Sequence, residues 1–251
     1  MNIGPMLNLY PDSLGGTLDD VVDFLKTEEA EGAFSSCYIL PSLYHTDLDR
    51  GFSVIDYSLN KMYASGETLE AIKKLGIELK LDFILNHASV LSKQFQDIIA
   101  KGEESEYKDF FINWNEFWKD CGEMTEQGYI LPEEKYLKKM FFRKPGLPIL
   151  MVRFPDGREI PYWNTFYQEV IYSHIDEQEL VQEYGIQYEL AKILAAQANA
   201  AIDAGSKPSE LELGRWNEYR AQVSACLEKK RRYLGQMDLN IQSPLVWEYY
   251  E

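Results

Sequence analysis

Residues 79–89 read Leu-Lys-Leu-Asp-Phe-Ile-Leu-Asn-His-Ala-Ser, and this stretch indicates the fold class. Its run of apolar and aromatic residues is typical of a β-strand that is covered on both faces. The polar residues Asn86, His87 and Ser89 come where such a strand should end. In parallel α/β proteins the functional groups gather at the carboxyl ends of the strands, so His87 is a candidate site residue. A hydrogen-bonded structural histidine is the alternative interpretation.

The segments before this stretch alternate between strand and helix patterns. Residues 6–10 form a short apolar run, and residues 17–26 carry leucine and valine at helical spacing. A second strand is expected at residues 36–40 and a second helix at 67–75, with a long polar and aromatic loop between them. The order β-α-β-α-β predicts an α/β protein whose working groups lie in the loops after the strands.

This alternation of strand and helix ends after His87. Residues 88–165 contain an aromatic cluster and two extended runs around Pro155-Asp156-Gly157, which predict a hairpin within an inserted subdomain. We expect the aromatic residues to form a small core rather than a platform for a ligand. They are Phe110, Phe111, Trp114, Phe117 and Trp118.

Residues 173–234 predict a long helical hairpin. The first helix is expected at about 176–204, and the second begins with a capping box formed by Ser209 and Glu212. The basic run 229–232 lies near the end of the second helix, where it would complement the helix dipole. A contact with phosphate is the alternative interpretation of this run.

Composition limits the classes of partner and compartment. The 251 residues can bury a full core, and 25 basic against 41 acidic side chains give a net charge of −16, which argues against nucleic acid and anionic membranes. Cys37, Cys121 and Cys226 lack metal-binding spacing, which favours reduced thiols in a cytoplasmic protein. Residues 1–10 do not resemble a signal peptide, and no apolar run has membrane-spanning length. We expect neither a metal site nor another cofactor.

Several short motifs follow one another in the order found in one enzyme family. They are Asp49-Arg-Gly-Phe-Ser-Val-Ile-Asp56, Asp82-Phe-Ile-Leu-Asn-His87, Ser92-Lys-Gln-Phe-Gln-Asp97, Lys101-Gly-Glu-Glu-Ser-Glu-Tyr107, Pro145-Gly-Leu-Pro148 and Gln236-Met-Asp-Leu-Asn240. With the first five, residues 6–166 resemble the start of a sucrose phosphorylase, which is a branch of the α-amylase superfamily (glycoside hydrolase family 13). The sixth resembles a short motif that the superfamily carries in its inserted subdomain.

The resemblance implies an α/β fold that is part of a (β/α)8 TIM barrel. Residues 1–87 would form its first three βα units, and residues 88–240 would form a large subdomain inserted after the third strand. This subdomain includes the helical hairpin at about 173–234. Residues 241–251 would begin the next barrel helix, and the chain would end before the fourth strand.

The resemblance also implies retaining chemistry on an α-glucoside. A carboxylate attacks the anomeric carbon, a carboxylic acid protonates the leaving oxygen, and inorganic phosphate resolves the glucosyl-enzyme. The family places the nucleophile on the fourth strand in an Arg-x-Asp motif, the acid on the fifth, and an assisting aspartate after the seventh. None of these groups has a counterpart in this sequence, so we expect the chain alone to be inactive.

Four positions match groups that bind the sugar in the family. Asp49 matches the acidic residue that hydrogen-bonds the glucosyl hydroxyls, and Phe52 matches the aromatic wall. His87 matches the histidine that donates to a hydroxyl near the reacting carbon, and Gln236 matches a glutamine close to the acceptor. Apart from the resemblance, a solvated loop carboxylate and a packed core ring are the simpler interpretations of Asp49 and Phe52.

Three further positions match residues that brace strand ends and loops. They are Asp56, Asp82 and Asn86.

The helical hairpin departs from the family pattern, and it would reshape the acceptor side of the site. A glucosyl polyol or a glucosylated acid therefore suits the sequence as well as sucrose does. Three functions stay open: part of a longer phosphorylase, a truncated protein that binds sugar without catalysis, or one half of a split enzyme whose missing barrel half is a separate chain. We favour the first, because three barrel strands cannot close and their outer edges are prone to aggregation.

Overall fold

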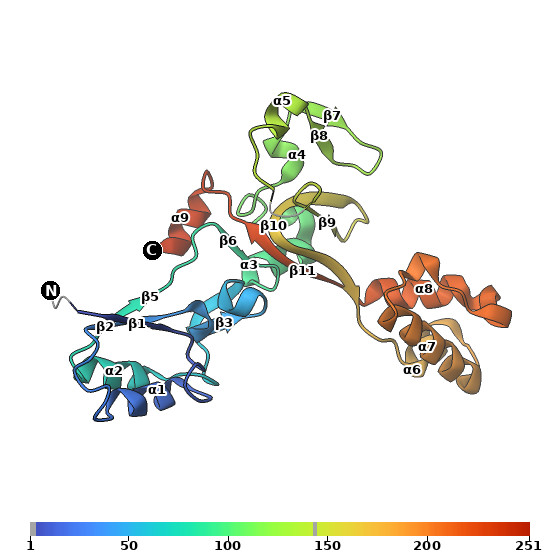
Figure 1. Ribbon diagram of the computed structural model, residues 1–251. Coiled ribbons are helices and arrows are strands. Elements are labelled where there is room, and N and C mark those ends of the chain that lie inside the picture. Colours follow the sequence, from blue (N-terminus) through green and yellow to red (C-terminus); the bar gives the residue numbers. More distant parts are fainter. Residues whose placement is uncertain (1–3, 143–144) are drawn as a thin grey trace. The chain divides into compact units, whose positions relative to one another are not determined.

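The structure is a computed structural model that describes residues 4–142 and 145–251 (Figure 1). It has two compact units: residues 169–234 form one, and the described residues of 1–168 and 235–251 form the other. The strands are β1 Met6–Leu9, β2 Ser36–Ile39, β3 Tyr44–Thr46, β4 Val54–Leu59, β5 Glu78–Leu81, β6 His87–Ser89, β7 Gly122–Met124, β8 Ile130–Pro132, β9 Ile149–Arg153, β10 Glu159–Tyr172 and β11 Arg231–Asp238. The α-helices are α1 Leu18–Leu25, α2 Gly66–Lys74, α3 Lys93–Lys101, α4 Trp114–Phe117, α5 Glu134–Leu137, α6 Glu177–Tyr184, α7 Tyr188–Asp203, α8 Arg220–Lys229 and α9 Pro244–Tyr250.

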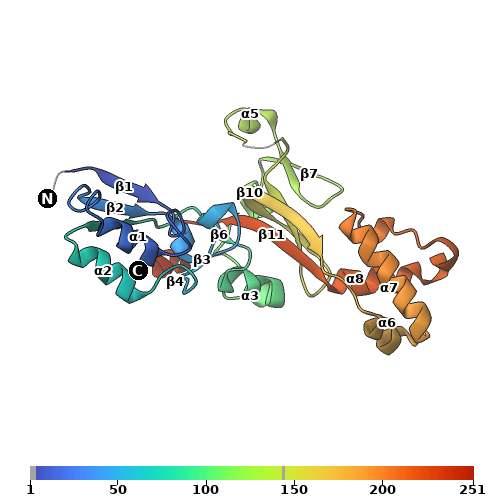
Figure 2. The ribbon, with the colours of Figure 1, turned by 60° about the horizontal axis from the view of Figure 1, so that its bottom comes forward.

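Strands β1, β2 and β5 form a parallel sheet in that order. Helices α1 and α2 cover one face of this sheet (Figure 2). The apolar side chains at helical spacing on α1, from Leu18 to Leu25, are buried against the sheet. Thr68 of α2 donates a hydrogen bond of 2.8 Å to Asp19 of α1, which joins the two helices. The three parallel strands thus alternate with α1 and α2, but the segment expected as a long loop between β2 and α2 also contains the antiparallel pair of β3 and β4.

The stretch 79–89 is not one strand covered on both faces, as its sequence predicted. Strand β5 ends at Leu81, and β6 begins at His87 and pairs with β11 in a second sheet. The side chains of Leu81, Phe83 and Leu85 are 38%, 45% and 51% exposed. Leu81 is exposed because β5 is an edge strand and α1 and α2 cover one face of its sheet, whereas Phe83 and Leu85 lie outside any strand, in the segment between β5 and β6.

The second sheet has the order β6-β11-β10-β9. Strands β9 and β10 are antiparallel, and the turn at residues 155–157 joins them, which confirms the hairpin predicted there. Strand β11 pairs antiparallel with β6 over three residues. The sheet therefore joins the end of the 79–89 stretch to a segment near the carboxyl end of the chain.

The aromatic cluster at residues 110–118 forms a core, as predicted, with one exception. Its buried members are Phe110, Phe111, Trp114 and Trp118. The indole nitrogen of Trp114 donates a hydrogen bond of 2.7 Å to the carbonyl oxygen of Ile130. Phe117 is the exception, because 53% of it is exposed.

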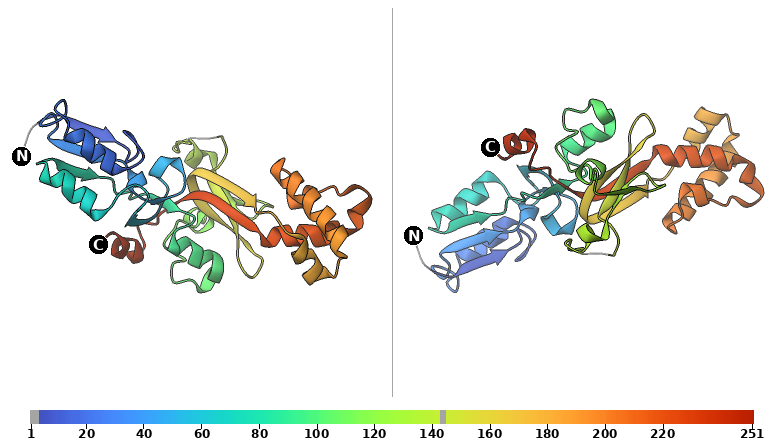
Figure 3. Two further views of the ribbon diagram at one scale, coloured as in Figure 1. Left: turned by 90° about the horizontal axis from the view of Figure 1, so that it is seen from below. Right: turned by 90° about the horizontal axis from the view of Figure 1, so that it is seen from above.

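In the second unit, helices α6, α7 and α8 pack side by side (Figure 3), so the expected two-helix hairpin is wrong in detail. The helix expected at 176–204 is interrupted, because Gly185 takes a left-handed conformation (φ 65°) and ends α6. Ser209 lies in a 3₁₀ turn instead of capping a long helix, and α8 begins only at Arg220.

The basic run 229–232 is largely neutralised within the second unit. Lys229 forms an ion pair with Glu183, and Lys230 forms one with Glu179. Strand β11 begins at Arg231, so the run crosses from the helix end into a strand. The ion pairs with α6 weaken the alternative interpretation that this run contacts phosphate.

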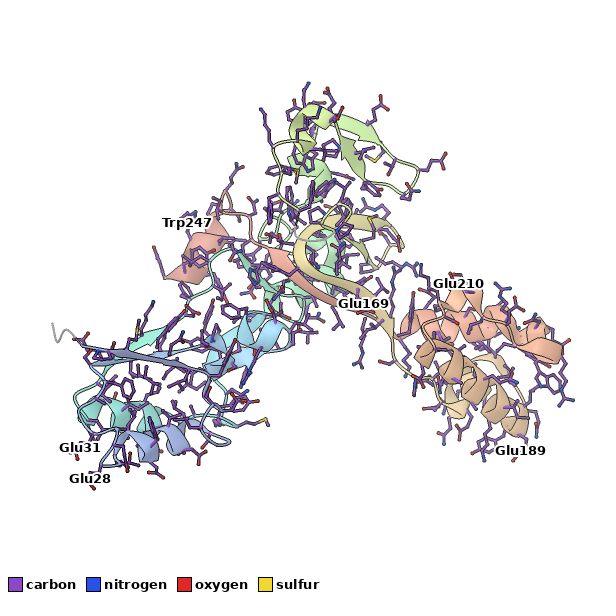
Figure 4. All side chains as sticks on the ribbon, in the orientation of Figure 1. Glu28, Glu31, Glu169, Glu189, Glu210 and Trp247 are labelled. Carbon is purple, nitrogen blue, oxygen red and sulfur yellow. The ribbon has the colours of Figure 1, made fainter. Side chains whose placement is uncertain are left out.

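Acidic side chains lie on the surface of both units. Glu28 and Glu31 project from the loop after α1, and Glu189 projects from α7 (Figure 4). Most of the net charge of −16 is thus exposed to solvent, where repulsion between carboxylates is weak. In the part of the chain that the structure describes, no helix is both long enough and apolar enough to cross a bilayer.

The core of the second unit generates a test of stability. Leu194 is fully buried on α7, whereas its neighbour Ile193 is 41% exposed. Leu194→Ala should lower the free energy of unfolding by about 2–5 kcal/mol, because it leaves a cavity among packed side chains. Ile193→Ala should lower it by less than about 1 kcal/mol. Urea unfolding monitored by hydrogen exchange of residues 169–234 measures the free energy of unfolding of both variants. Equal losses in the two variants would contradict this assignment of the core.

Candidate functional site

The site begins with the pairing of β6 and β11, which places Gln236 opposite Ser89 and Asp238 opposite His87. The side chain of Gln236 is fully buried, and its Nε2 lies 3.4 Å from Oδ2 of Asp49. Because a carboxylate only accepts hydrogen bonds, the amide nitrogen of Gln236 must face Asp49. Its oxygen, Oε1, is buried and has no hydrogen-bond partner among the described residues.

Asp49 lies in a tight turn that also positions Phe52. Asp49 and Arg50 both have left-handed backbone conformations, with φ of 56° and 47°. Such conformations cost free energy for residues other than glycine, and they often mark functional sites. Gly51 follows with φ of 107°, and a Cβ atom there would come within 2.2 Å of the backbone nitrogen of Ser42.

His87 is held against this turn. Its Nε2 lies 2.9 Å from the carbonyl oxygen of Phe52, and a carbonyl only accepts, so Nε2 carries a proton. The imidazole is 95% buried, and its ring lies 4.9 Å from the ring of Phe166. The backbone of Phe52 thus binds His87, whereas its side chain is only half-buried.

The structure brings together the four residues that the sequence nominates for sugar binding. Asp49 contacts Gln236, and Phe52 contacts His87. The two pairs are linked because Gln236 and His87 lie on paired strands. The cluster combines a carboxylate, an amide and an imidazole, and the ring of Phe166 packs on the imidazole, which is a suitable set for the hydroxyls and the apolar face of a sugar.

Two residues at the site, Asn164 and Phe166, were missed by sequence reasoning. The side-chain oxygen of Asn164 accepts a hydrogen bond of 3.3 Å from the backbone N–H of Gln236, and Phe166 packs on His87. Ser89, which the sequence placed in the polar cluster with His87, donates a hydrogen bond of 2.8 Å to Asp47, on the loop that leads to Asp49. Residues 164–166 directly continue the predicted hairpin strand, and that position was the only signal in the sequence.

The motif Pro145–Pro148 lies beside these residues. The backbone N–H of Asn164 donates a hydrogen bond of 2.8 Å to the carbonyl oxygen of Pro148, and Gln168 donates to Leu147. A small pocket of about 40 Å³ is lined by this motif together with Trp163 and Phe166. The motif therefore adjoins the aromatic side of the site.

The three residues expected to brace the site have distinct contacts. Asp82 accepts a hydrogen bond of 2.5 Å from Tyr38 on the neighbouring β2, and this bond raises the pKa of Tyr38 to about 12. Although burial acts to raise it, the pKa of Asp56 lies below its usual range because Ser58 and His45 hydrogen-bond its carboxylate. Asn86 is exposed, and its carbonyl oxygen accepts from the N–H of Leu239.

Asp238 is a partly buried residue whose carboxyl lies next to the site. The backbone N–H of Thr165 donates a hydrogen bond of 3.0 Å to the Asp238 carboxyl. The hydroxyl of Thr165 lies within 2.9 Å of both carboxyl oxygens of Asp238. Burial raises the pKa of Asp238 to about 7, although the hydrogen bonds from Thr165 act to lower it. Among residues 4–142 and 145–251, no group of three or more His, Cys, Asp or Glu side chains is arranged to hold a metal ion.

Comparison with known proteins defines the class to which this fold and site are related. No family model matches the chain. The crystal structure of the sucrose 6F-phosphate phosphorylase from Thermoanaerobacter thermosaccharolyticum matches with a TM-score of 0.63 and 25% identity, over 100% of this chain and 36% of that one. A trehalulose synthase structure matches with a TM-score of 0.53 at 15% identity and supports the fold alone. The structural neighbours of this chain are thus enzymes of the α-amylase superfamily, glycoside hydrolase family 13, and the chain shares the fold of the parts that it matches.

Sequence relatives narrow this class. The chain is 42% identical over 245 residues to the sucrose 6(F)-phosphate phosphorylase of Ilumatobacter coccineus, covering 98% of this chain and 36% of the relative. It is 33% identical over 168 residues to the sucrose phosphorylase of Streptococcus mutans, covering 66% of this chain and 32% of the relative. The chain is therefore a homologue of the sucrose 6(F)-phosphate phosphorylases over their amino-terminal portion, and it spans about a third of their length.

The turn at residues 49–52 gives a first prediction about the site. Gly51→Ala should lower the free energy of unfolding by more than about 2 kcal/mol, because it adds a clash with Ser42 to the strain of a positive φ. Gly128→Ala is the matched control, since Gly128 also has a positive φ (89°) but has open space around it. Urea unfolding of both variants measures the difference, and equal losses would show that the contact with Ser42 is not tight.

Asp238 gives a prediction about pH. Its pKa is raised in the folded state, so the folded state binds the proton more tightly than the unfolded chain does. This tighter proton binding stabilises the folded state fully below about pH 4, and the stabilisation is lost as pH rises to about 7. Each unit by which the pKa is raised corresponds to about 1.4 kcal/mol in the free energy of unfolding. Asp238→Asn should abolish this fall in the free energy of unfolding. Urea unfolding between these pH values tests it, and an identical slope in the variant would place the titration elsewhere.

Proposed function

We propose that this chain is the amino-terminal part of a retaining glucosyl phosphorylase that acts on a sucrose-like α-glucoside. In this proposal the chain carries groups that bind the donor sugar, but it lacks the catalytic carboxylates. The observation that carries the proposal is the convergence of Asp49, Phe52, His87 and Gln236 in one cluster. The relatives' names, which are those of sucrose phosphorylases, support the same reaction class.

Each residue of the cluster has a chemical role in this proposal. The Asp49 carboxylate accepts hydrogen bonds from sugar hydroxyls, and the buried Oε1 of Gln236 accepts one from the acceptor side of the substrate. His87 is oriented by its bond to the carbonyl oxygen of Phe52, and Phe52 offers its ring to the apolar face of the sugar. A buried acceptor without a partner costs free energy, and a bound hydroxyl would relieve that cost.

The bond-making steps belong to residues outside this chain. A carboxylate attacks the anomeric carbon, and the bond to the leaving oxygen breaks as an acid protonates that oxygen. An oxygen of inorganic phosphate then attacks the same carbon and displaces the carboxylate, which gives a glucose 1-phosphate. Asp49 and Gln236 would hold the sugar in place during both steps.

The parallel sheet β1-β2-β5 would be the first three strands of a (β/α)8 barrel, with residues 88–240 as the inserted subdomain. In a closed barrel the free edge of β5 pairs with a fourth strand. The side chains of Leu81, Phe83 and Leu85 would then be covered by the remaining barrel. Their exposure in this chain supports a larger assembly.

The same exposed row supports a second candidate, in which the remaining barrel is a separate chain. Mixing the two chains should then restore the release of glucose 1-phosphate, and inactivity of the mixture would exclude it. A truncated sugar-binding protein, in contrast, must be monodisperse and fold cooperatively alone. Size exclusion and thermal melting of the purified chain test that alternative.

We further propose that the protein works in the cytoplasm with an α-glucoside and inorganic phosphate as its partners. Its three cysteines, Cys37, Cys121 and Cys226, are free, which is typical of a reducing compartment. The experiment that tests the main proposal is to read the gene beyond codon 251. A continuing frame with an Arg-x-Asp motif on a fourth strand would support it, and a stop codon there would exclude it in favour of the two alternatives.

Asp49→Asn tests the proposed site in the complete or reconstituted enzyme. It should lower kcat/KM for phosphate-dependent release of glucose 1-phosphate by about tenfold to a hundredfold, because a charged acceptor of sugar hydroxyls becomes neutral. Asp120→Asn is the matched control, since Asp120 also has a positive φ (62°) and asparagine tolerates this conformation. If both variants keep the activity of the original protein, Asp49 does not bind the donor.

A further inference from the structure

A pocket of about 370 Å³ lies away from the cluster around Asp49 and Gln236, in the first unit. The segment between α3 and α4 forms one side of it, and the hairpin of β9 and β10 forms another. The stretch before α9 closes the third side. None of the four candidate donor-binding residues lines this pocket. Its polar lining includes Glu103, Lys108, Asp109, Asn113 and Glu116.

One wall of this pocket is fixed by hydrogen bonds. The backbone N–H of Asn240 donates a hydrogen bond of 2.9 Å to the carbonyl oxygen of Phe110. Its side-chain amide donates a hydrogen bond of 3.0 Å to the carbonyl oxygen of Asp109. The side-chain oxygen of Asn240 accepts from the N–H of Gln242 at 3.2 Å. Asn113 caps α4 through its side-chain oxygen, so its position is also fixed. The pocket is therefore built from ordered groups rather than from loose surface side chains.

Tyr162 is the most informative residue of the lining. It is 99% buried, and the small part of it that stays accessible belongs to the pocket lining. Burial raises its pKa, and the charges of Glu103 and Asp109, which line the same pocket, raise it further. A tyrosine hydroxyl can both donate and accept a hydrogen bond, so a ligand hydroxyl that reaches it can bind there in either role.

The chemistry of the lining separates the classes of ligand. The carboxylates of the lining, on Glu103, Asp109 and Glu116, repel phosphate. The ammonium of Lys108 and the ion pair of Glu103 with Arg158 offset part of their attraction for an organic cation. The lining offers both acceptors and donors, the latter including the Tyr162 hydroxyl and the amide of Asn113. Phe117 adds a ring that is 53% exposed in a protein whose other large aromatics in this cluster are buried. Mixed donors and acceptors beside an exposed ring suit a neutral molecule that carries several hydroxyl groups.

We propose that this pocket is a second carbohydrate-binding site, which takes a neutral polyhydroxylated ligand about the size of a monosaccharide. Its ring packs on Phe117, and its hydroxyls bond to Glu116, Asp109 and the Tyr162 hydroxyl. The site works independently of the cluster around Asp49, and it does not depend on the function proposed for that cluster.

The test uses the full chain with Asp49→Asn as its background, because this change weakens any binding at the donor cluster. The probe is methyl α-D-glucopyranoside, followed by saturation-transfer NMR. Glu116→Gln should raise the Kd by about tenfold, and Phe117→Ala should do the same, since both side chains are exposed and their loss leaves the fold intact. Tyr162→Phe should raise it about threefold, because it removes one hydroxyl and keeps the ring.

Glu126→Gln is the matched control, since it makes the same change of charge at an exposed position outside the pocket, and it should leave the Kd unchanged. Three results would overturn the proposal. They are an absence of saturable binding, equal weakening by Glu126→Gln, and binding of n-butylamine at the pocket in place of the glucoside.

Discussion

The antiparallel pairing of β6 with β11 is the interaction on which the arrangement of the site depends. It joins His87, near the first sheet, to Asp238, which comes after the whole helical unit. Hydrogen bonds from Val90 to Gly235 and from Leu239 to Asn86 extend the pairing at both ends. Closing so long a loop costs chain entropy, and buried side chains on both strands offset that cost. A slip of one residue would turn Gln236 to the opposite face and separate it from Asp49.

The groups around this pairing are locally unfavourable and are held by their surroundings. Asp49 has a strained backbone, Gln236 has a buried oxygen without a partner in the described chain, and Asp238 has a carboxyl that resists ionisation. Each of these features costs free energy on its own. They occur within one small region, whereas the cores under α1 and in the helical unit consist of apolar side chains. This contrast is what distinguishes a site from a scaffold.

The sequence predicted those parts of the fold that depend on local pattern. Helix α1 follows from the spacing of Leu18 and Leu25, and the hairpin of β9 and β10 follows from its turn residues. The interruption at Gly185 and the strand that begins at Arg231 were not predicted, because helical periodicity continues through both. The row from Leu81 to Leu85 resembled a fully buried strand, since a sequence does not show which neighbours are present.

The residues of the candidate site also divide into those that local motifs predicted and those that they did not. Asp49 and Gln236 were found because they lie in motifs that resemble a known family. Asn164 and Phe166 were missed, because their place beside Gln236 and His87 comes from pairing between distant strands. Local pattern carries no information about that pairing.

The helical unit leaves the sheet through β10 and returns through the adjacent β11, and the N–H of Ser173 donates to the carbonyl oxygen of Lys230 at 3.2 Å. Its entry and exit points are therefore neighbours, as in a protein module inserted at the tip of a hairpin. Modules with adjacent ends can be gained, lost or exchanged during evolution without breaking the host sheet. The same geometry makes this position a natural graft point, where an engineer could replace the module with a tight turn or with a foreign domain.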